Sequence, residues 1–390
     1  MDRYLEQQAN TVEEVLAAHG IPARVAGGTL SPRLIHFLLE LAPGLRLAAL
    51  TPALPDLAER LGVEAVRLAP DAEQGRPTLE VPRPDPVPVR LLPLARSVAE
   101  IAPPCTATLG SDVGGSPLLL RLDAPEVGPT LVSGDAGAGK SALLRSMALS
   151  LALHNGPDTL RFLLLDLSGP ARRGLRTGTW SDMERLPHLI GAPIRDLLEA
   201  RLRLRWAVRL VESRAELAQE GRPIEGAHLV VLIDGLEALL AGRDAAEMEA
   251  AIKTIAAGRD LGVELVASTN DPTLGDLLEW GARVVGRVNS AGAATAAAGV
   301  RGTGAEGLLG RGDFLAVLGG EVIRLQAAFA AGAEVGRTVA LLHECAQERV
   351  GSGQPQAVRR ARAMDEDEAA ERRGLWKAQR GPIRLLKSGS

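Results

Sequence analysis

The sequence predicts an α/β fold in which helices cover both faces of a largely parallel β-sheet. From residue 130 onward, short apolar runs alternate with longer helical stretches. Two of these runs, 162–165 and 228–233, are followed directly by Asp166 and Asp234, as expected of buried parallel strands that end at a polar sheet edge. A third run, 130–132, leads through a glycine-rich turn into a helix. Together these observations are typical of successive βαβ units.

The glycine-rich turn carries a complete Walker A pattern, Gly134-x-x-x-x-Gly139-Lys140-Ser141. Its glycines allow backbone N–H groups to surround phosphate oxygens, and the helix that follows adds partial positive charge. The lysine is placed to reach the β- and γ-phosphates, and the serine hydroxyl to help hold Mg²⁺. The pattern therefore predicts an ATP and Mg²⁺ site. Its expected nucleotide-binding residues are Gly134, Asp135, Ala136, Gly137, Ala138, Gly139, Lys140, Ser141 and Ala142.

Lysine usage supports this interpretation. The chain has 44 Lys and Arg residues, of which four are lysines, at positions 140, 253, 377 and 387. A sequence that carries nearly all of its positive charges on arginine thus places one of its four lysines in the phosphate loop. Ammonium and guanidinium groups are not interchangeable at such a site.

The run 228–234 has the form of a Walker B strand. It is apolar, ends in Asp234 and follows the phosphate loop by about 90 residues. A carboxylate at the carboxyl end of such a strand can bind the Mg²⁺ shell. We therefore expect Ser141 and Asp234 to be the metal-binding residues, with Asp234 also among the catalytic residues.

Length and composition limit the possible domain organisation and class of protein. The 390 residues suffice for two domains and a tail, which we place at 1–95, 96–345 and 346–390. Hydrophobic residues make up 46% and charged residues 24%, as in ordinary globular protein. We find no apolar run long enough for a membrane span and no leader peptide, and therefore expect a cytoplasmic protein. The two cysteines predict neither a disulfide framework nor a zinc site.

Charge is unevenly distributed. The net charge is −4, and residues 346–390 carry ten Lys or Arg against six Asp or Glu, so that residues 1–345 carry −8. Contact with nucleic acid would thus come from local loops or from the tail. A helix expected at about 194–217 carries a series of arginines at positions 201, 203, 205, 209 and 214. We favour a solvated helix face or subunit contact for these arginines over DNA contact.

The remaining elements follow from periodicity and turn residues. We expect 81–88 to be too rich in proline for regular pairing and 350–390 to be disordered or conditionally helical. A hairpin is expected at 109–122, just before the phosphate-loop strand. Further helices are expected at 11–19, 53–61, 142–154 and 244–258. Further strands are expected at 21–25, 34–41, 63–68, 263–267, 284–288, 314–317 and 322–328, the last closing the sheet edge.

Several segments in order resemble the FtsK/SpoIIIE DNA translocases of the FtsK–HerA branch of P-loop ATPases. They are Glu40-Leu-Ala-Pro-Gly44, Leu109-Gly-x-Asp112, Pro187-His-Leu189 and Gly304-Ala-Glu-x-Leu-Leu-Gly-x-Gly-Asp313. The resemblance covers about residues 11–343. It implies a RecA-like motor domain, preceded by a small α/β domain, that assembles as a hexameric ring around double-stranded DNA. It also implies that Arg259 is offered to the γ-phosphate of the neighbouring subunit. Asn270 stands where the family has a polar, phosphate-sensing residue.

Three departures from the family pattern concern chemistry. Gly235 follows Asp234, where the family usually has a glutamate that polarises the attacking water. Glu237 is the nearest carboxylate, and it should point elsewhere unless the local backbone is unusual. Segment 290–298, which corresponds to the basic pore loop, has no charge, and Leu167-Ser168 replaces a Pro-Lys pair. The candidate catalytic residues are thus Asp234, Glu237, Arg259 and Asn270.

Two functions of different classes fit these observations. The first is an ATP-dependent translocase of double-stranded DNA, acting as a homo-hexamer or as a mixed ring with another motor subunit. The second is a catalytically weakened, ATP-binding paralogue that serves as a scaffold or regulatory subunit of a ring ATPase. A ring ATPase that moves protein, as in type VII secretion, fits less well, because such chains usually carry tandem motor domains.

Overall fold

The computed structural model describes residues 2–70, 77–169, 180–352 and 384–386. The chain forms two compact units, residues 1–88 with 113–115 and residues 89–112 with 116–390. The sequence had placed this division at residue 95. The structure places it earlier because helix α3 (Leu91–Val98) buries Leu91 and Leu94 in the core of the second unit.

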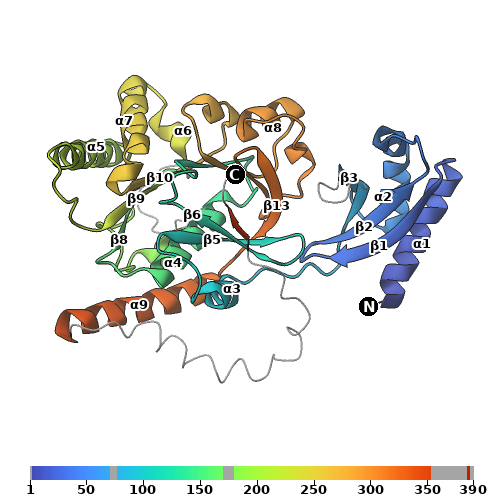
Figure 1. Ribbon diagram of the computed structural model, residues 1–390, viewed down its shortest axis with the longest axis horizontal. Helices are drawn as coiled ribbons and strands as arrows, with labels where there is room; N and C mark the ends of the chain where they lie inside the picture. Colours follow the sequence, from blue (N-terminus) through green and yellow to red (C-terminus); the bar gives the residue numbers. More distant parts are fainter. Residues whose placement is uncertain (1, 71–76, 170–179, 353–383, 387–390) are drawn as a thin grey trace. The chain divides into compact units, whose positions relative to one another are not determined.

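The first unit is a small α/β domain built on a four-stranded antiparallel sheet, as the sequence predicts (Figure 1). The strand order is β1-β2-β4-β3. Apolar side chains from both helices and from the sheet form one core. Its elements are α1 (Asp2–Ala18), β1 (Ala23–Leu30), β2 (Leu34–Leu41), the 3₁₀ helix η1 (Leu47–Ala53), α2 (Leu54–Leu61), β3 (Arg67–Pro70) and β4 (Pro77–Pro82).

Strand β4 corrects one expectation. The proline-rich passage 81–88 was expected not to pair, yet Val81 and Pro82 belong to this strand and lie opposite Ile35 and Leu34. The prolines of β4 stand at its two ends, where a missing N–H interrupts the hydrogen-bond ladder least. Val81 is buried in the core of the unit. Packing of its side chain thus outweighs the low strand propensity of its neighbours.

The second unit is a RecA-like α/β domain with a ten-stranded mixed sheet, in the order β14-β6-β5-β13-β12-β11-β7-β10-β9-β8. The five strands β11, β7, β10, β9 and β8 run parallel, as predicted. Strands β12, β13, β5 and β6 extend this parallel part by antiparallel pairing. The strands are β5 (Thr106–Asp112), β6 (Pro117–Arg121), β7 (Thr130–Ser133), β8 (Leu160–Asp166), β9 (His228–Asp234), β10 (Val263–Thr269), β11 (Ala282–Val285), β12 (Asp313–Leu318), β13 (Glu321–Ala327) and β14 (Arg384–Leu386).

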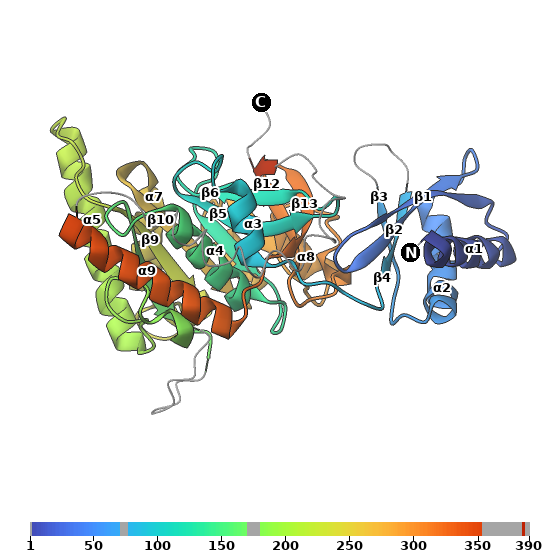
Figure 2. The same cartoon turned by 90° about the horizontal axis from the view of Figure 1, so that it is seen from below.

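Helices cover both faces of this sheet and enclose two hydrophobic cores. Side chains of α3, α4 and α9 contribute to one core, and those of α5, α6 and α7 to the other. Figure 2 shows α3, α4 and α9 together on one face. The helices are α4 (Lys140–His154), α5 (Leu197–Gln219), α6 (Leu236–Leu239), α7 (Ala245–Ala257), α8 (Ala291–Ala298) and α9 (Gly332–Ser352). Short 3₁₀ turns occur at η2 (Ser181–Met183), η3 (Arg259–Leu261), η4 (Pro272–Asp276) and η5 (Ala305–Gly307).

The sheet edge and the tail differ from expectation. Strand β13 was expected to close the edge, but it lies between β12 and β5, because the β5–β6 hairpin adds to its free side. Helix α9 continues to Ser352, past the expected start of the tail at residue 346. Residues 384–386, expected to be disordered or conditionally helical, form a strand that pairs in parallel with β6. The rest of that expected tail, 353–383 and 387–390, lies outside the described residues.

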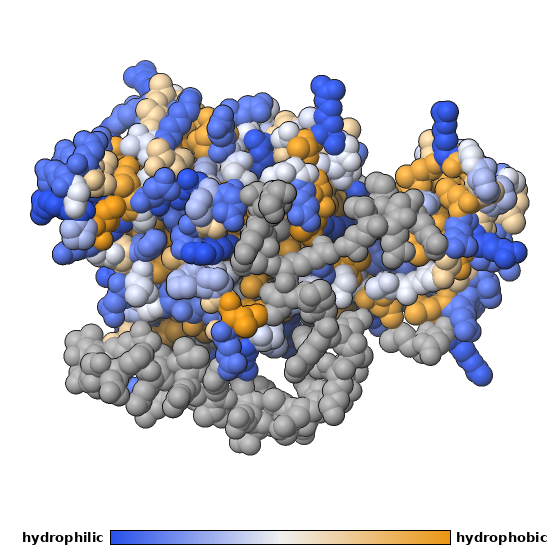
Figure 3. Space-filling view, viewed as in Figure 1, coloured by the Kyte–Doolittle hydropathy of each residue, from blue (hydrophilic) through white to orange (hydrophobic). Residues whose placement is uncertain are grey.

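The arginines of α5 hold the helix to its neighbours. Arg201 pairs with Asp244, which precedes α7, and Arg205 pairs with Glu247 on α7. Arg203 pairs with Glu199 along α5 itself. The buried Arg214 donates to the backbone carbonyls of Ala227, Leu261 and Gly262. Figure 3 shows hydrophilic side chains gathered where α5 and α7 lie. The sequence suggested a solvated helix face or a subunit contact, and the ion pairs of Arg201, Arg203 and Arg205 favour the solvated face, whereas Arg214 is buried.

Candidate functional site

The phosphate loop occupies the strand–turn–helix context that its sequence pattern requires. Strand β7 lies between β11 and β10 in the parallel part of the sheet, and α4 begins at Lys140. Gly134 and Gly139 adopt φ angles of 146° and 105°, which side chains rarely reach. A Cβ at Gly139 would lie 2.8 Å from the backbone nitrogen of Gly312. Glycine is thus required there by both the backbone angle and the close approach of another loop.

Lys140 lies inside the loop, with 9% of its surface exposed. Its Nζ donates to the carbonyl oxygens of Gly134 (2.8 Å) and Asp135 (3.0 Å) and to Oδ1 of Asn270 (2.7 Å). Burial lowers the pKa of the Lys140 ammonium, while the negative charges of Glu237 and Asp234 act in the opposite direction. Its three acceptors match the three donors of an ammonium group. The charge is therefore held where phosphate oxygens would arrive.

Asn270 connects this lysine to Glu237. Strand β10 lies between β7 and β9, and Asn270 directly follows its carboxyl end. Its Nδ2 donates to Oε1 of Glu237 at 2.8 Å, while its Oδ1 accepts from Lys140. A lysine can only donate and a carboxylate can only accept, so this orientation of the amide is the one that satisfies both partners. The structure thus joins three sequence-predicted residues into one hydrogen-bonded chain.

Asp234 ends β9 and is fully buried. Its Oδ1 accepts from the Ser268 hydroxyl (2.6 Å). Its Oδ2 accepts from the Trp180 indole N–H (3.1 Å) and the Ser168 hydroxyl (3.3 Å). Sequence reasoning missed all three donors. Ser268, near the carboxyl end of a buried strand, and Ser168, in the place of the family's lysine, offered some signal, whereas Trp180 offered none.

The donor set suits Mg²⁺. A serine hydroxyl in the first turn of α4, Ser141, and the carboxylate of Asp234 are hard oxygen ligands. Within the described ranges, no group of three or more His, Cys, Asp or Glu side chains is arranged to hold a metal ion. Mg²⁺ in nucleotide-binding proteins is usually held by one or two carboxylates together with substrate phosphates.

Gly235 has an unusual backbone, with φ 96° and ψ 58°. A Cβ there would lie 2.7 Å from the backbone nitrogen of Ser168 and 2.8 Å from the carbonyl carbon of Leu167. Position 235, where the family usually has a glutamate, is therefore restricted to glycine by the close packing of the backbone after β8 against the end of β9. The left-handed turn also lets α6 begin immediately, which places Glu237 in its first turn. This unusual backbone corrects the expectation that Glu237 points away from the site.

Arg259 lies at the opposite edge of the sheet. The phosphate loop, Asp234 and Asn270 follow the carboxyl ends of β7, β9 and β10, whereas Arg259 precedes the amino end of β10. Its Nη1 donates to the Pro125 carbonyl at 2.6 Å, and its Nε donates to Asp260 at 3.2 Å. Arg259 therefore does not reach the phosphate loop of its own chain. A role at the site of a neighbouring subunit remains a prediction.

Near Arg259, strand β10 buries an acid. Glu264 is 2% exposed, and its Oε1 accepts no hydrogen bond from the described part of the chain. Burial above all, with a contribution from Asp123, raises the pKa of this carboxyl from 4.5 to about 8. In the native state Glu264 thus keeps its proton to a higher pH than in the unfolded chain. The free energy of unfolding should fall as the pH rises from about 4.5 to about 8.

Replacing Glu264 by glutamine should flatten this pH dependence, because glutamine keeps the shape of the protonated acid. We expect the wild type to lose on the order of 3 kcal/mol more stability than Glu264→Gln between pH 5 and pH 8.5. Urea unfolding followed by tryptophan fluorescence measures this difference. The exposed Glu321→Gln is the control and should behave like the wild type. Equal pH profiles for wild type and Glu264→Gln would contradict the assignment.

The uncharged segment 290–298, expected to correspond to the pore loop, is largely helical. Ser290 caps α8 by accepting from the backbone nitrogen of Ala293, and Ala294, Ala297 and Ala298 are buried. These alanines pack with Val285 and Val288 in a small core. The segment therefore serves packing in this chain.

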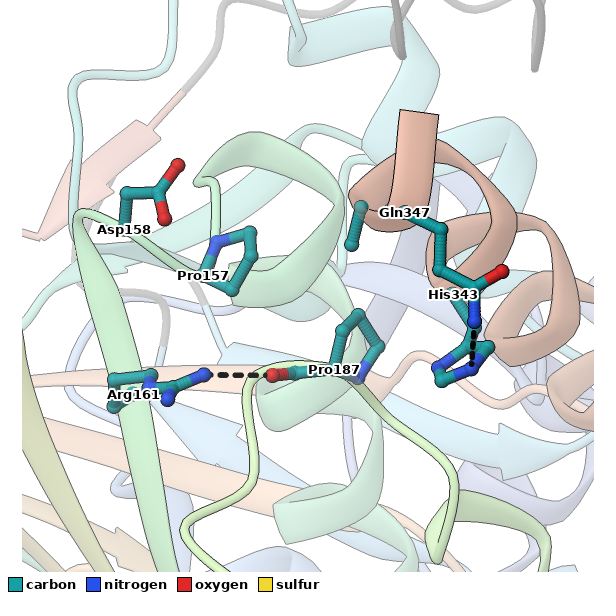
Figure 4. Close-up of a pocket in the computed structure, with 7 residues that line it drawn as sticks. Pro157, Asp158, Arg161, Pro187, His343 and Gln347 are labelled. Atoms are coloured by element: carbon teal, nitrogen blue, oxygen red, sulfur yellow. Dashed lines mark hydrogen bonds between the residues drawn. The ribbon is translucent and has the colours of Figure 1, made fainter. Parts of the chain in front are cut away.

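A separate hollow of about 530 Å³ lies between the start of β8 and the second half of α9 (Figure 4). Arg161 donates to the carbonyl of Pro187 on one side, and Gln347 contacts His343 on the other. The start of β8 is at the sheet edge opposite the phosphate loop. The hollow is therefore not part of the nucleotide site.

The phosphate loop follows β7, and Asp234 ends β9, two strands away in the same sheet. This arrangement defines a P-loop nucleotide-binding protein with a RecA-like core. Residues 96–266 match the model of the FtsK/SpoIIIE family, and residues 1–83 match that of the FtsK alpha domain. The chain therefore carries an FtsK alpha domain followed by an FtsK/SpoIIIE family domain.

Relatives support this assignment. The DNA translocase FtsK of Vibrio vulnificus is 33% identical over 217 residues, which are 55% of this chain and 21% of that protein. The DNA translocase SftA of Bacillus subtilis is 28% identical over 394 residues, which cover 94% of this chain and 40% of that protein. The chain thus spans well under half the length of these relatives.

Solved structures share the fold. The pCW3 conjugation coupling protein TcpA, solved with ATPγS, superposes with a TM-score of 0.55 at 15% identity, over 86% of this chain and 99% of that one. The cytoplasmic domain of the Thermomonospora curvata type VII secretion ATPase EccC gives a TM-score of 0.52 at 25% identity, over 65% of this chain and 34% of that one. No helix among the described residues is both long and apolar enough to cross a membrane.

Proposed function

We propose that this chain is the ATP-driven motor of a translocase that acts on double-stranded DNA. The chain of hydrogen bonds from Lys140 through Asn270 to Glu237, at the carboxyl edge of the sheet, carries the proposal. It places a phosphate-binding cation and a carboxylate side by side, as phosphoryl transfer to water requires. The relatives named DNA translocases support the choice of substrate, since one of them matches 94% of this chain.

In this proposal, ATP binds the loop 134–142, and Ser141 and Asp234 hold its Mg²⁺ ion. Mg²⁺ would neutralise the charge that develops on the phosphates. Arg259, at the far edge of the sheet, would complete the site of the next subunit in a homo-hexamer or a mixed ring. The protein would work in the cytoplasm.

A second candidate is an ATP-binding scaffold or regulatory subunit that hydrolyses ATP poorly. The observation that favours it is Gly235, which stands where the family usually has its water-polarising glutamate. The two candidates differ in whether bound ATP is turned over and whether DNA affects the rate.

We expect duplex DNA to raise the ATPase rate of the purified protein several-fold. The motor couples hydrolysis to movement along DNA, so its cycle should accelerate when the track is present. Steady-state phosphate release with and without duplex DNA measures this effect, and a single-stranded oligonucleotide is the matched control. DNA affinity should also fall steeply with salt, by about 10³-fold or more between 50 and 200 mM if arginines contact six or more phosphates. ATP binding without turnover, with or without DNA, would instead support the scaffold.

A further inference from the structure

The charges of Glu237, Asp234 and Asp135 all act on Lys140. Two of these carboxylates lie on either side of Gly235, since Asp234 ends β9 and Glu237 is in the first turn of α6. Their surroundings differ. Both oxygens of Asp234 accept hydrogen bonds from protein side chains, and the group is fully buried. Three of its four lone pairs accept hydrogen bonds from Ser268, Trp180 and Ser168, which leaves one for the Mg²⁺ that Asp234 would hold.

Glu237 is bonded at one oxygen only. Its Oε1 accepts from Nδ2 of Asn270 at 2.8 Å and, more weakly, from the backbone nitrogen of Asn270 at 3.4 Å. Its Oε2 is buried and has no hydrogen-bond partner among the described residues. A buried carboxylate oxygen without a donor costs free energy comparable to a lost hydrogen bond or more. Such a group is suited to receive a ligand that donates, and a water molecule is the smallest ligand that does.

The position of Glu237 is built into the backbone. At Gly235 the chain turns left-handed and α6 starts at once, so the second residue of the helix faces the end of β10. No side chain fits at position 235, because the backbone of 167–168 lies within 3 Å of the Cβ position. The acid that the family carries directly after the strand is thus excluded here by packing. The same turn brings the next available acid to the site.

Resting on the function proposed above, we propose that Glu237 is the general base of ATP hydrolysis, in place of the missing acid at position 235. The oxygen of a water molecule attacks the γ-phosphorus and forms a new P–O bond. The bond between the γ-phosphorus and the β,γ-bridging oxygen breaks, and its electron pair leaves with ADP. The proton released by the water passes to Oε2 of Glu237 and then to phosphate or solvent. Asn270 keeps its hydrogen bonds to Glu237 and Lys140 during this step and so fixes the positions of both side chains.

Glu237→Gln separates this role from a structural one. A glutamine still offers a carbonyl oxygen to Nδ2 of Asn270, so a merely structural Glu237 would tolerate the change. As a base it would not, and we expect kcat to fall by about 10²- to 10⁴-fold. The affinity for a fluorescent ATP analogue should stay within twofold. The matched control is Glu249→Gln, an exposed glutamate paired with Lys253 on α7, which should keep wild-type kcat.

The ATPase rates of these variants distinguish the role of Glu237 from the proposed DNA translocase function. If Glu237→Gln keeps kcat within threefold of the wild type while Glu237→Ala loses it, Glu237 is a positioning residue and the inference is wrong. If the wild type hydrolyses ATP at a rate that DNA does not change, and Glu237→Gln does not hydrolyse it, the inference holds and the DNA translocase proposal fails. A wild type that binds ATP without hydrolysing it overturns both.

Discussion

Lys140→Ala should lower kcat for ATP hydrolysis by about 10²- to 10³-fold and weaken ATP binding. The ammonium is the positive charge inside the loop, and it already bonds two loop carbonyls and Asn270. Alanine removes the group that would neutralise β- and γ-phosphate oxygens. Steady-state phosphate release and equilibrium binding of a fluorescent ATP analogue measure the two effects.

The control for this change is Lys253→Ala. Lys253 is an exposed lysine paired with Glu249 on α7, and removing a surface ion pair of this kind changes stability by less than about 1 kcal/mol. ATP affinity that is unchanged in Lys140→Ala would show that the loop is not the nucleotide site. Near-UV circular dichroism of both variants shows whether the fold is kept.

The same variant tests the proposed ring. Lys140→Ala subunits retain Arg259, and Arg259→Ala subunits retain an intact phosphate loop. Mixing the two should restore activity above that of either alone, because some interfaces then pair an intact loop with an intact arginine. The lack of any recovery in stable mixed assemblies would show that Arg259 does not act on a neighbour.

Gly235→Ala should lower the free energy of unfolding of the second unit by about 3–5 kcal/mol. A Cβ at this position is strained twice. The left-handed backbone, φ 96°, costs a non-glycine residue about 1–2 kcal/mol. The Cβ also meets the backbone of Ser168 and Leu167 at 2.7 and 2.8 Å, and backbone atoms cannot rotate away.

Gly242→Ala measures the first contribution alone, so that the difference from Gly235→Ala gives the second. Gly242 has a similar φ of 89°, and a Cβ there would meet nothing within 4 Å. This variant should lower the free energy of unfolding only by the cost of the left-handed backbone, about 1–2 kcal/mol. Urea unfolding followed by tryptophan fluorescence suits the comparison, because all four tryptophans lie beyond residue 88 and none reports on the first unit. Equal losses of unfolding free energy in Gly235→Ala and Gly242→Ala would show that residues 167–168 move aside at little cost.

The same clash bears on catalysis. Gly235→Glu restores the residue that the family usually has after the Walker B aspartate, yet it should not raise the ATPase rate. The added side chain would push apart the ends of β8 and β9, and would disturb the turn that positions Glu237. A variant that is both stable and faster than the wild type would contradict this account of the site.

The elements of the motor domain were predictable because their signals are local. The phosphate loop depends on glycines and a lysine within eight residues, and β9 is an apolar run that ends in an acid. Strand β4 was harder to predict, since it depends on packing that overrides proline-rich neighbours. Strand β14 pairs with β6, about 265 positions earlier in the chain, and nothing in its own three residues indicates that partner.

The Walker A and Walker B patterns in the sequence placed Lys140 and Asp234 in one site, and the resemblance to the family added Asn270 to the candidate residues. Only the tertiary structure decided how they pair. Strand order and backbone angles determine three features of the site. Trp180 and Ser268 donate hydrogen bonds to Asp234, no side chain fits at Gly235, and Asn270 donates to Glu237. These contacts join residues from 33 to 68 positions apart, beyond the reach of any local pattern.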